Sequence, residues 1–155
     1  MSYRRHMTRW WMLVTGLVLV TAGTAWAGPA LVRTVRCSGS GESARVVVDL
    51  SRPMSYETRL SADSTALILE IPGAVSEASL GEVSVGAGGV RSVRTQALED
   101  SHGPRVELTF HLDARVEWTH FALPQGRGKP ARIVVDCVRR GDLPERKRQP
   151  HEGDV

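Results

Sequence analysis

The chain has 155 residues, of which 41% are hydrophobic and 24% are charged, and its formal net charge at pH 7 is +3. That length suits a single domain, and the hydrophobic fraction is enough for a buried core, which excludes a wholly disordered protein. The isoelectric point is near 9.3, a value that favours a nucleic-acid or anionic-membrane partner only if the charge lies on the folded part.

Residues 1–27 have the pattern of a secretory signal peptide. Three arginines lie within the first nine residues, an almost wholly apolar run follows over 10–25, and Ala25-Trp26-Ala27 matches the small-x-small cleavage pattern. We expect Sec-type export to the periplasm, with cleavage after about Ala27. The alternative is a retained membrane anchor. A spanning helix needs about 20 apolar residues and this run is shorter, so we expect no stable anchor after cleavage.

Cleavage changes the charge balance. Three of the 20 basic residues and none of the 17 acidic ones lie in residues 1–27, so the remaining chain carries 17 of each. A neutral chain lacks the positive charge with which nucleic-acid-binding proteins neutralise phosphates. We therefore expect no nucleic-acid partner.

From residue 30 onward the chain consists of short alternating runs separated by turn residues. The runs with strand character are 32–36, 45–50, 67–71, 90–94, 105–112 and 133–137. In 105–112 every second residue is apolar, and in 45–50 the side chains of Val46, Val48 and Leu50 share one face, which is typical of half-buried strands. Glycine- and proline-rich turns cut the chain into about eight strands, and only 75–80 offers a helical turn.

These runs also repeat in order. Residues 32–36 match 90–94, 44–48 match 104–108, Tyr56 aligns with Trp118, and 67–71 match 133–137. We interpret this as an internal duplication with units of about 30–74 and 88–138, in which 86–89 forms the linker. If the four strands of each unit form one sheet, the two apolar faces can pack together. The prediction is an all-β sandwich of two similar four-stranded sheets; the alternative is chance similarity between amphipathic strands.

Composition changes after the predicted domain, 28–138. Residues 139–150 carry mixed charges and only one apolar residue other than proline. Such a segment cannot offset the entropy of ordering by burial. We expect 139–155 to form a flexible charged tail.

The two cysteines, Cys37 and Cys137, lie near the ends of the domain. In an oxidising compartment an even number of cysteines favours a disulfide. The alternative is two separate thiols that act as small apolar side chains. Cys137 is in phase with Ile133 and Val135, so it should point inward in either case. Without a CxxC pair or a neighbouring histidine, the cysteines predict no metal site.

No motif predicts catalysis. The histidines lack the HExxH spacing, no GxSxG is present, and the glycine-rich segment 86–89 lacks the Lys-Ser/Thr of a phosphate loop. We expect no enzyme activity, no cofactor and no metal. Outward strand positions instead carry arginines, whose planar guanidinium groups suit carboxylates, phosphates and sugars. The alternative is that these arginines solubilise the sheets and pair across strands with Asp49, Glu70, Glu107 and Asp136.

Four segments resemble the AMIN domain, the amidase N-terminal module of exported bacterial cell-wall proteins. They are 44–53 (ARVVVDLSRP), 66–74 (ALILEIPGA), 90–94 (VRSVR) and 131–137 (ARIVVDC). The resemblance covers about residues 30–138 and implies a sandwich of two similar four-stranded sheets. It also implies a non-catalytic module that holds cell-wall amidases or type IV pilus secretins at the wall by binding peptidoglycan. The chain departs from the pattern at Asp113-Ala114, where the first copy has Arg52-Pro53, and in its cysteine pair.

We therefore expect a periplasmic, non-catalytic peptidoglycan-binding module that targets the cell wall. Its candidate ligand contacts are Arg45, Arg105, Tyr56 and Trp118, on an open sheet face. One alternative is a protein-interaction module that assembles a pilus or secretion complex by pairing along a free sheet edge. Another is the severed N-terminal part of an N-acetylmuramoyl-L-alanine amidase, since no amidase or secretin sequence follows residue 139. The expected partners are peptidoglycan and a cell-wall amidase or a pilus or secretion component.

Overall fold

The computed structural model describes residues 28–78 and 80–143, and every regular element within that range is a β-strand. The strands are β1 (Ala30–Ser40), β2 (Ser43–Leu50), β3 (Glu57–Leu60), β4 (Ala66–Pro72), β5 (Ala74–Ser76), β6 (Gly81–Ala87), β7 (Val90–Asp100), β8 (Gly103–Leu112), β9 (Ala114–Leu123) and β10 (Ala131–Asp142). No helix in this part of the chain is long and apolar enough to cross a membrane. The predicted signal peptide and most of the predicted tail lie outside the described residues, while β10 continues past the predicted boundary at 138 to Asp142.

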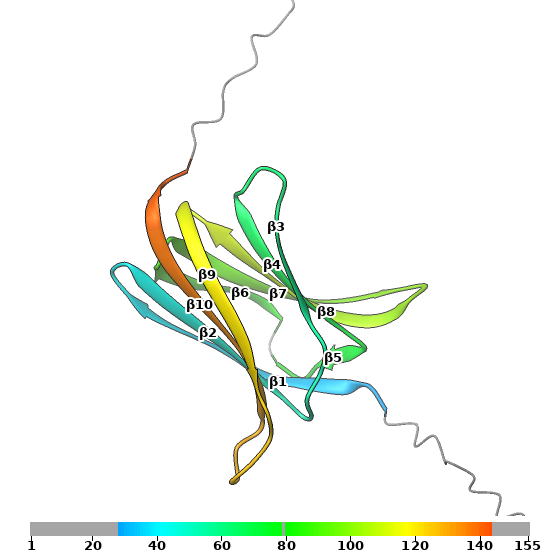
Figure 1. Ribbon diagram of the computed structural model, residues 1–155. Helices are drawn as coiled ribbons and strands as arrows, with labels where there is room; N and C mark the ends of the chain where they lie inside the picture. The colour runs from blue at the N-terminus through cyan, green and yellow to red at the C-terminus, as the bar shows by residue number, and fades with distance from the viewer. Residues whose placement is uncertain (1–27, 79, 144–155) are drawn as a thin grey trace, which may run out of the picture.

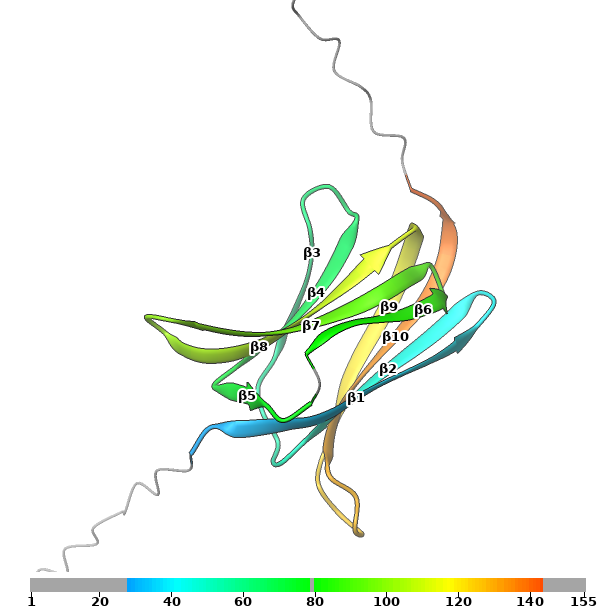
Figure 2. The ribbon, with the colours of Figure 1, turned by 180° about the vertical axis from the view of Figure 1, so that it is seen from behind.

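The strands form two sheets that pack against each other (Figures 1 and 2). Sheet A has the order β5-β1-β2-β10-β9, and sheet B has the order β3-β4-β8-β7-β6. All neighbours are antiparallel except β1 and β5. The all-β prediction is confirmed, but each sheet has five strands where four were expected. The additional strands are β5 and β6, which come from the segment between the two proposed units and each extend one edge.

Neither sheet is built from one half of the chain. Sheet A joins β1 and β2 to β9 and β10, and sheet B joins β3 and β4 to β7 and β8. The expectation of one sheet per unit is therefore wrong, because the central pairs β2–β10 and β4–β8 each connect the two units. The two sheets nevertheless follow one plan. Sheet A contains the order β1-β2-β10-β9, and sheet B contains the corresponding strands of the other unit in the same order, β7-β8-β4-β3. This common plan is what a duplication would produce, and the duplication itself stays a prediction.

The core lies between the sheets and follows the predicted period of two. Every second residue of the four central strands is fully buried: Val46, Val48 and Leu50 of β2, Leu67, Leu69 and Ile71 of β4, Val106, Leu108 and Phe110 of β8, and Ile133 and Val135 of β10. Phe110 is the largest of these side chains. Burial of apolar surface on this scale is the main favourable contribution to folding.

The segment 86–89, expected as a linker, contains a tight turn between β6 and β7. Gly88 and Gly89 have φ angles of 62° and 75°, as in the two-residue type I′ turns that suit twisted hairpins. The amide of Gly88 donates a hydrogen bond of 3.0 Å to the carbonyl of Gly41, in the turn between β1 and β2. A Cβ atom on Gly88 would lie 2.5 Å from the backbone nitrogen of Ala44. This turn of sheet B is therefore held against sheet A.

The predicted disulfide between Cys37 and Cys137 is wrong, since both cysteines are free. Strand β2 lies between them: Cys37 is opposite Val46, and Cys137 is opposite Ala44. Strands two places apart in a sheet are separated by about 10 Å, whereas bridged Cα atoms lie within about 7 Å of each other. Burial raises the pKa of both thiols, that of Cys137 to about 12 with a contribution from Asp136. The cysteines act as apolar side chains, as the alternative interpretation held.

Candidate functional site

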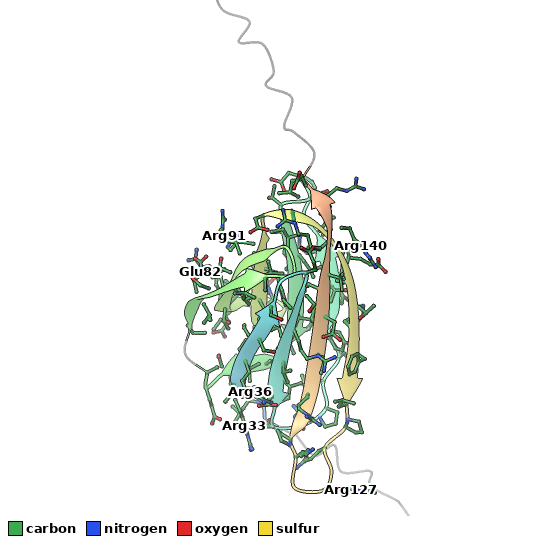
Figure 3. The ribbon with its side chains drawn as sticks, turned by 90° about the vertical axis from the view of Figure 1, so that its left-hand side faces the viewer. Arg33, Arg36, Glu82, Arg91, Arg127 and Arg140 are labelled. Atoms are coloured by element: carbon green, nitrogen blue, oxygen red, sulfur yellow. The ribbon has the colours of Figure 1, made fainter. Side chains whose placement is uncertain are left out.

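The outward residues of sheet A form three rows across β1, β2, β10 and β9. Antiparallel partners share a face of the sheet, so the strand registers give the rows directly. They are Thr34, Asp49, Arg132 and Leu123; then Arg36, Val47, Val134 and Phe121; then Ser38, Arg45, Asp136 and Thr119. We call these twelve residues the sheet A face. Figure 3 looks onto these four strands, with Arg36 low on the face and Arg140 near its upper end.

Two arginine–aspartate pairs lie on this face, and each is joined at two points. Arg36 donates from Nε and Nη2 to the carboxylate of Asp49, at 3.2 and 2.9 Å. Arg45 donates in the same way to Asp136, at 2.6 and 2.7 Å. Such two-point pairs are stronger and more directional than single contacts. They confirm the alternative interpretation that the arginines pair across strands.

The aspartates of these pairs have perturbed acidities. Asp49 is 8% exposed even though it faces outward. Burial would raise its pKa, but hydrogen bonds from Thr34 and Arg36 and the charges of Arg36 and Arg132 outweigh burial and lower that pKa. The hydrogen bond from Arg45 likewise lowers the pKa of Asp136. Both carboxylates are therefore ionised and committed to their arginines at neutral pH.

An apolar strip separates the two polar rows. Val47 and Val134 lie side by side at its centre, and Val134 is only 4% exposed despite facing outward. Phe121 continues the strip on β9 and is 40% exposed. A shallow groove of about 530 Å³ opens beside Arg45 and Asp136, next to the β1–β2 hairpin. The face thus combines hydrogen-bonding groups with an accessible aromatic ring.

The outward surface of sheet B has a different character. Its middle row consists of Glu57, Glu70, Glu107 and Gln96, on neighbouring strands. Arg105 approaches this row, with its Nε 3.6 Å from Glu70, and also contacts Asp100. Arg59 and Arg94 lie in the next row of the same surface, opposite Ile68 and Thr109. The three glutamates are therefore balanced by three arginines, and what distinguishes this surface from the sheet A face is that its described outward residues on β3, β4, β7 and β8 include no phenylalanine, tyrosine or tryptophan.

The four predicted ligand contacts do not share one face. Arg45 lies on the sheet A face and Arg105 on the outer surface of sheet B, on opposite sides of the sandwich. Tyr56 and Trp118 are partly buried against the core. The Tyr56 hydroxyl lies 3.1 Å from Nδ1 of His120 on β9, with the two rings edge to face at 5.5 Å. These aromatic residues contribute to packing between the sheets.

Phe121 is the residue that the sequence reasoning missed. Its strand alternates less clearly than the others, since Ala122 and Leu123 follow it directly. The available signal was its two-residue spacing from Glu117 and Thr119, which places it on their polar side.

No group of three or more histidine, cysteine, aspartate or glutamate residues among 28–78 and 80–143 could hold a metal ion. In a comparison with protein families, the AMIN domain model matches residues 32–137, which takes in most of β1 and β10 and everything between them. A comparison with curated proteins gives no match.

Proposed function

Because the chain belongs to the AMIN domain family, whose members are periplasmic peptidoglycan-binding modules, we propose that it is an exported, non-catalytic module that localises to the cell wall. Family membership gives the general ligand, and the proposal adds the role and the surfaces. The module binds peptidoglycan through the outer surfaces of its two sheets, with Arg45 and Arg105 as contacts.

The observation that carries this proposal is that no other described element covers either outer surface. Arginine side chains project from both, and the side chain of Arg45 is 56% exposed. Guanidinium groups form directional hydrogen bonds to the polar groups of sugars and peptides. Tyr56 and Trp118 present only part of their surface to solvent, so we expect them to contribute less than the arginines do.

The test is sedimentation with purified peptidoglycan sacculi. The 155-residue chain is expressed in a Gram-negative host, and the exported protein is purified and spun down with sacculi at low salt. We expect it to sediment, and we expect Arg45→Ala to weaken binding several-fold. Lys129→Ala, which removes a charge from the β9–β10 loop, serves as the control and should bind normally. Wild-type protein that stays in the supernatant would refute the proposal.

A second candidate function follows from β9, an edge strand of sheet A with ten residues. Residues 118–123 contain no lysine, no proline and no acidic residue, the features that usually protect an edge from pairing. Such an edge can accept an extended segment of a partner, for example a pilus or secretion subunit or a cell-wall amidase. Co-purification after lysozyme digestion separates the two functions, because a protein partner remains bound when the wall has been removed.

Catalysis is the outcome that would contradict the non-catalytic role. The purified protein is incubated with sacculi, and soluble peptides are measured. We expect no release above a buffer control. Release that requires the protein would indicate an amidase activity and would overturn this part of the proposal.

A further inference from the structure

We infer that the sheet A face binds the glycan strands of peptidoglycan rather than its peptide stems. This inference rests on the proposed function, because it names the part of the polymer that occupies one of the proposed surfaces. Glycan strands are rich in hydroxyl and N-acetyl groups, whereas peptide stems carry free carboxylates. The two ligands therefore require different groups on the protein.

Two of the three arginines of this face already hold carboxylates, since Arg36 and Arg45 bind Asp49 and Asp136 at two points each. The third, Arg132, lies opposite Asp49 and its charge helps to lower the pKa of that aspartate, while its Nε is buried. A stem carboxylate at Arg36 or Arg45 would have to displace one of their partners. Displacement at Arg36 would leave Asp49, which is 8% exposed, as a nearly buried charge without its main partner, and that is strongly unfavourable.

The paired groups suit a sugar instead. A guanidinium bound through Nε and Nη2 keeps further N–H donors, and its carboxylate keeps unused acceptor positions. Donors and acceptors thus lie next to each other in both polar rows. A hydroxyl group can donate and accept at once, so it can satisfy both partners without breaking the pair.

The apolar strip provides the second half of the recognition. Phe121 is 40% exposed and lies in line with Val47 and Val134. The C–H face of a sugar ring packs against an aromatic ring, whereas its edge carries hydroxyls. Rows on one face of a strand are about 7 Å apart. A sugar ring over the strip therefore brings its substituents toward the polar row on either side.

Sheet B does not offer this combination. Its glutamates Glu57, Glu70 and Glu107 lie beside Arg59, Arg94 and Arg105, so it offers hydrogen-bonding groups without an apolar strip that ends in an aromatic ring. None of its described outward residues on β3, β4, β7 and β8 is phenylalanine, tyrosine or tryptophan. The difference between the two surfaces favours the sheet A face as the glycan site.

The first test is competition for sacculi by two soluble probes, using the exported wild-type protein. One probe is uncharged glycan chains of β-1,4-linked N-acetylglucosamine, which carry no carboxylate, and the other is the stem peptides that an amidase releases from sacculi. We expect the glycan chains alone to compete, and we expect affinity to change less than about twofold up to about 0.5 M NaCl, because neutral contacts are little screened. Competition by stem peptides alone, or a steep loss of binding with salt, would overturn the inference.

Two variants test the residues. Phe121→Ala should weaken binding about five- to tenfold. The matched control is Leu80→Ala, which truncates another exposed apolar side chain (54% exposed) and should leave binding unchanged. Asp136→Asn gives opposite results for the two ligands. It should weaken glycan binding because the pair is broken, whereas it would strengthen binding if Arg45 contacted a stem carboxylate. If a variant fails to fold, the competition on wild-type protein still decides.

These outcomes also separate the inference from the proposed function. Failure of wild-type protein to bind intact sacculi rejects both. Binding to sacculi that only stem peptides compete away keeps the proposed function and rejects the glycan assignment.

Discussion

Replacing Gly88 by alanine should destabilise the sandwich more than the same change at Gly86, although the two backbones are alike. Their φ angles are 62° and 65°, and an alanine in this left-handed region costs about 1–2 kcal/mol at either position. The surroundings differ. A Cβ atom at Gly88 would lie 2.5 Å from the nitrogen of Ala44 and 2.9 Å from the carbonyl oxygen of Cys137, whereas a Cβ at Gly86 meets nothing within 4 Å.

The contacts at Gly88 are with backbone atoms of two paired strands. Ala44 and Cys137 are partners between β2 and β10, so neither can move without shifting the centre of sheet A. Overpacking of this kind typically costs a further 1–3 kcal/mol or so. We therefore expect Gly86→Ala to lower the free energy of unfolding by about 1–2 kcal/mol and Gly88→Ala to lower it by about 2–5 kcal/mol.

Urea denaturation of the exported protein measures both losses. Trp118 is the only tryptophan after residue 27 and packs partly against the core, so its fluorescence reports unfolding at one defined place. Circular dichroism on the same samples checks that the sheets unfold in the same transition. Equal losses in the two variants would refute the reasoning, because they would mean that the turn does not press on sheet A.

Three further predictions follow from the fold. Iodoacetamide treatment of the denatured, unreduced protein should add two adducts by mass spectrometry, at Cys37 and Cys137; no adducts would mean that the two are bridged. Phe110→Ala should lower the free energy of unfolding by about 3–5 kcal/mol in urea, and a loss below about 1 kcal/mol would contradict the burial of this ring. The fold holds the pKa of Asp49 below its ordinary value of 3.8, so the stability gained from its ionised form is present above that pH and is lost as the pH falls through the lowered pKa. Urea unfolding at about pH 6 and pH 3 should show this loss, and the loss should be smaller in Asp49→Asn.

The inward faces could be predicted because the signal for them is local. The alternation through Val46 and Val48 or through Val106 and Phe110 depends only on the period of a strand, and each of these side chains is fully buried. Which strands pair with each other depends instead on residues that are far apart in the sequence. Nothing in the run around Cys37 indicates that β2 lies between it and Cys137, and the disulfide prediction failed for that reason.

The candidate site shows the same division. Pairing of the arginines with acidic neighbours followed from outward positions and charge, and Arg45 with Asp136 confirms it. The prediction that Arg45 and Arg105 share one face was wrong, because β2 and β8 belong to different sheets. Which sheet a strand joins depends on its pairing partners and not on its own residues. The spacing of Phe121 from Glu117 and Thr119 indicates its outward side, but its place in line with Val134 is seen only when β9 is paired with β10.

The mixed origin of the sheets has a consequence for how the chain reaches its folded state. Strand β2 pairs with β10, so the central pairing of sheet A joins segments near opposite ends of the domain, while the pairing of β4 with β8 joins the two proposed units across the segment between them. Contacts of such long sequence separation slow folding, and sheet A stays incomplete until the last strand has been made and released. A chain with these strand pairings remains unfolded while it passes through an export channel. Its sheet A is completed only once β10 has emerged, which matches the proposed export route.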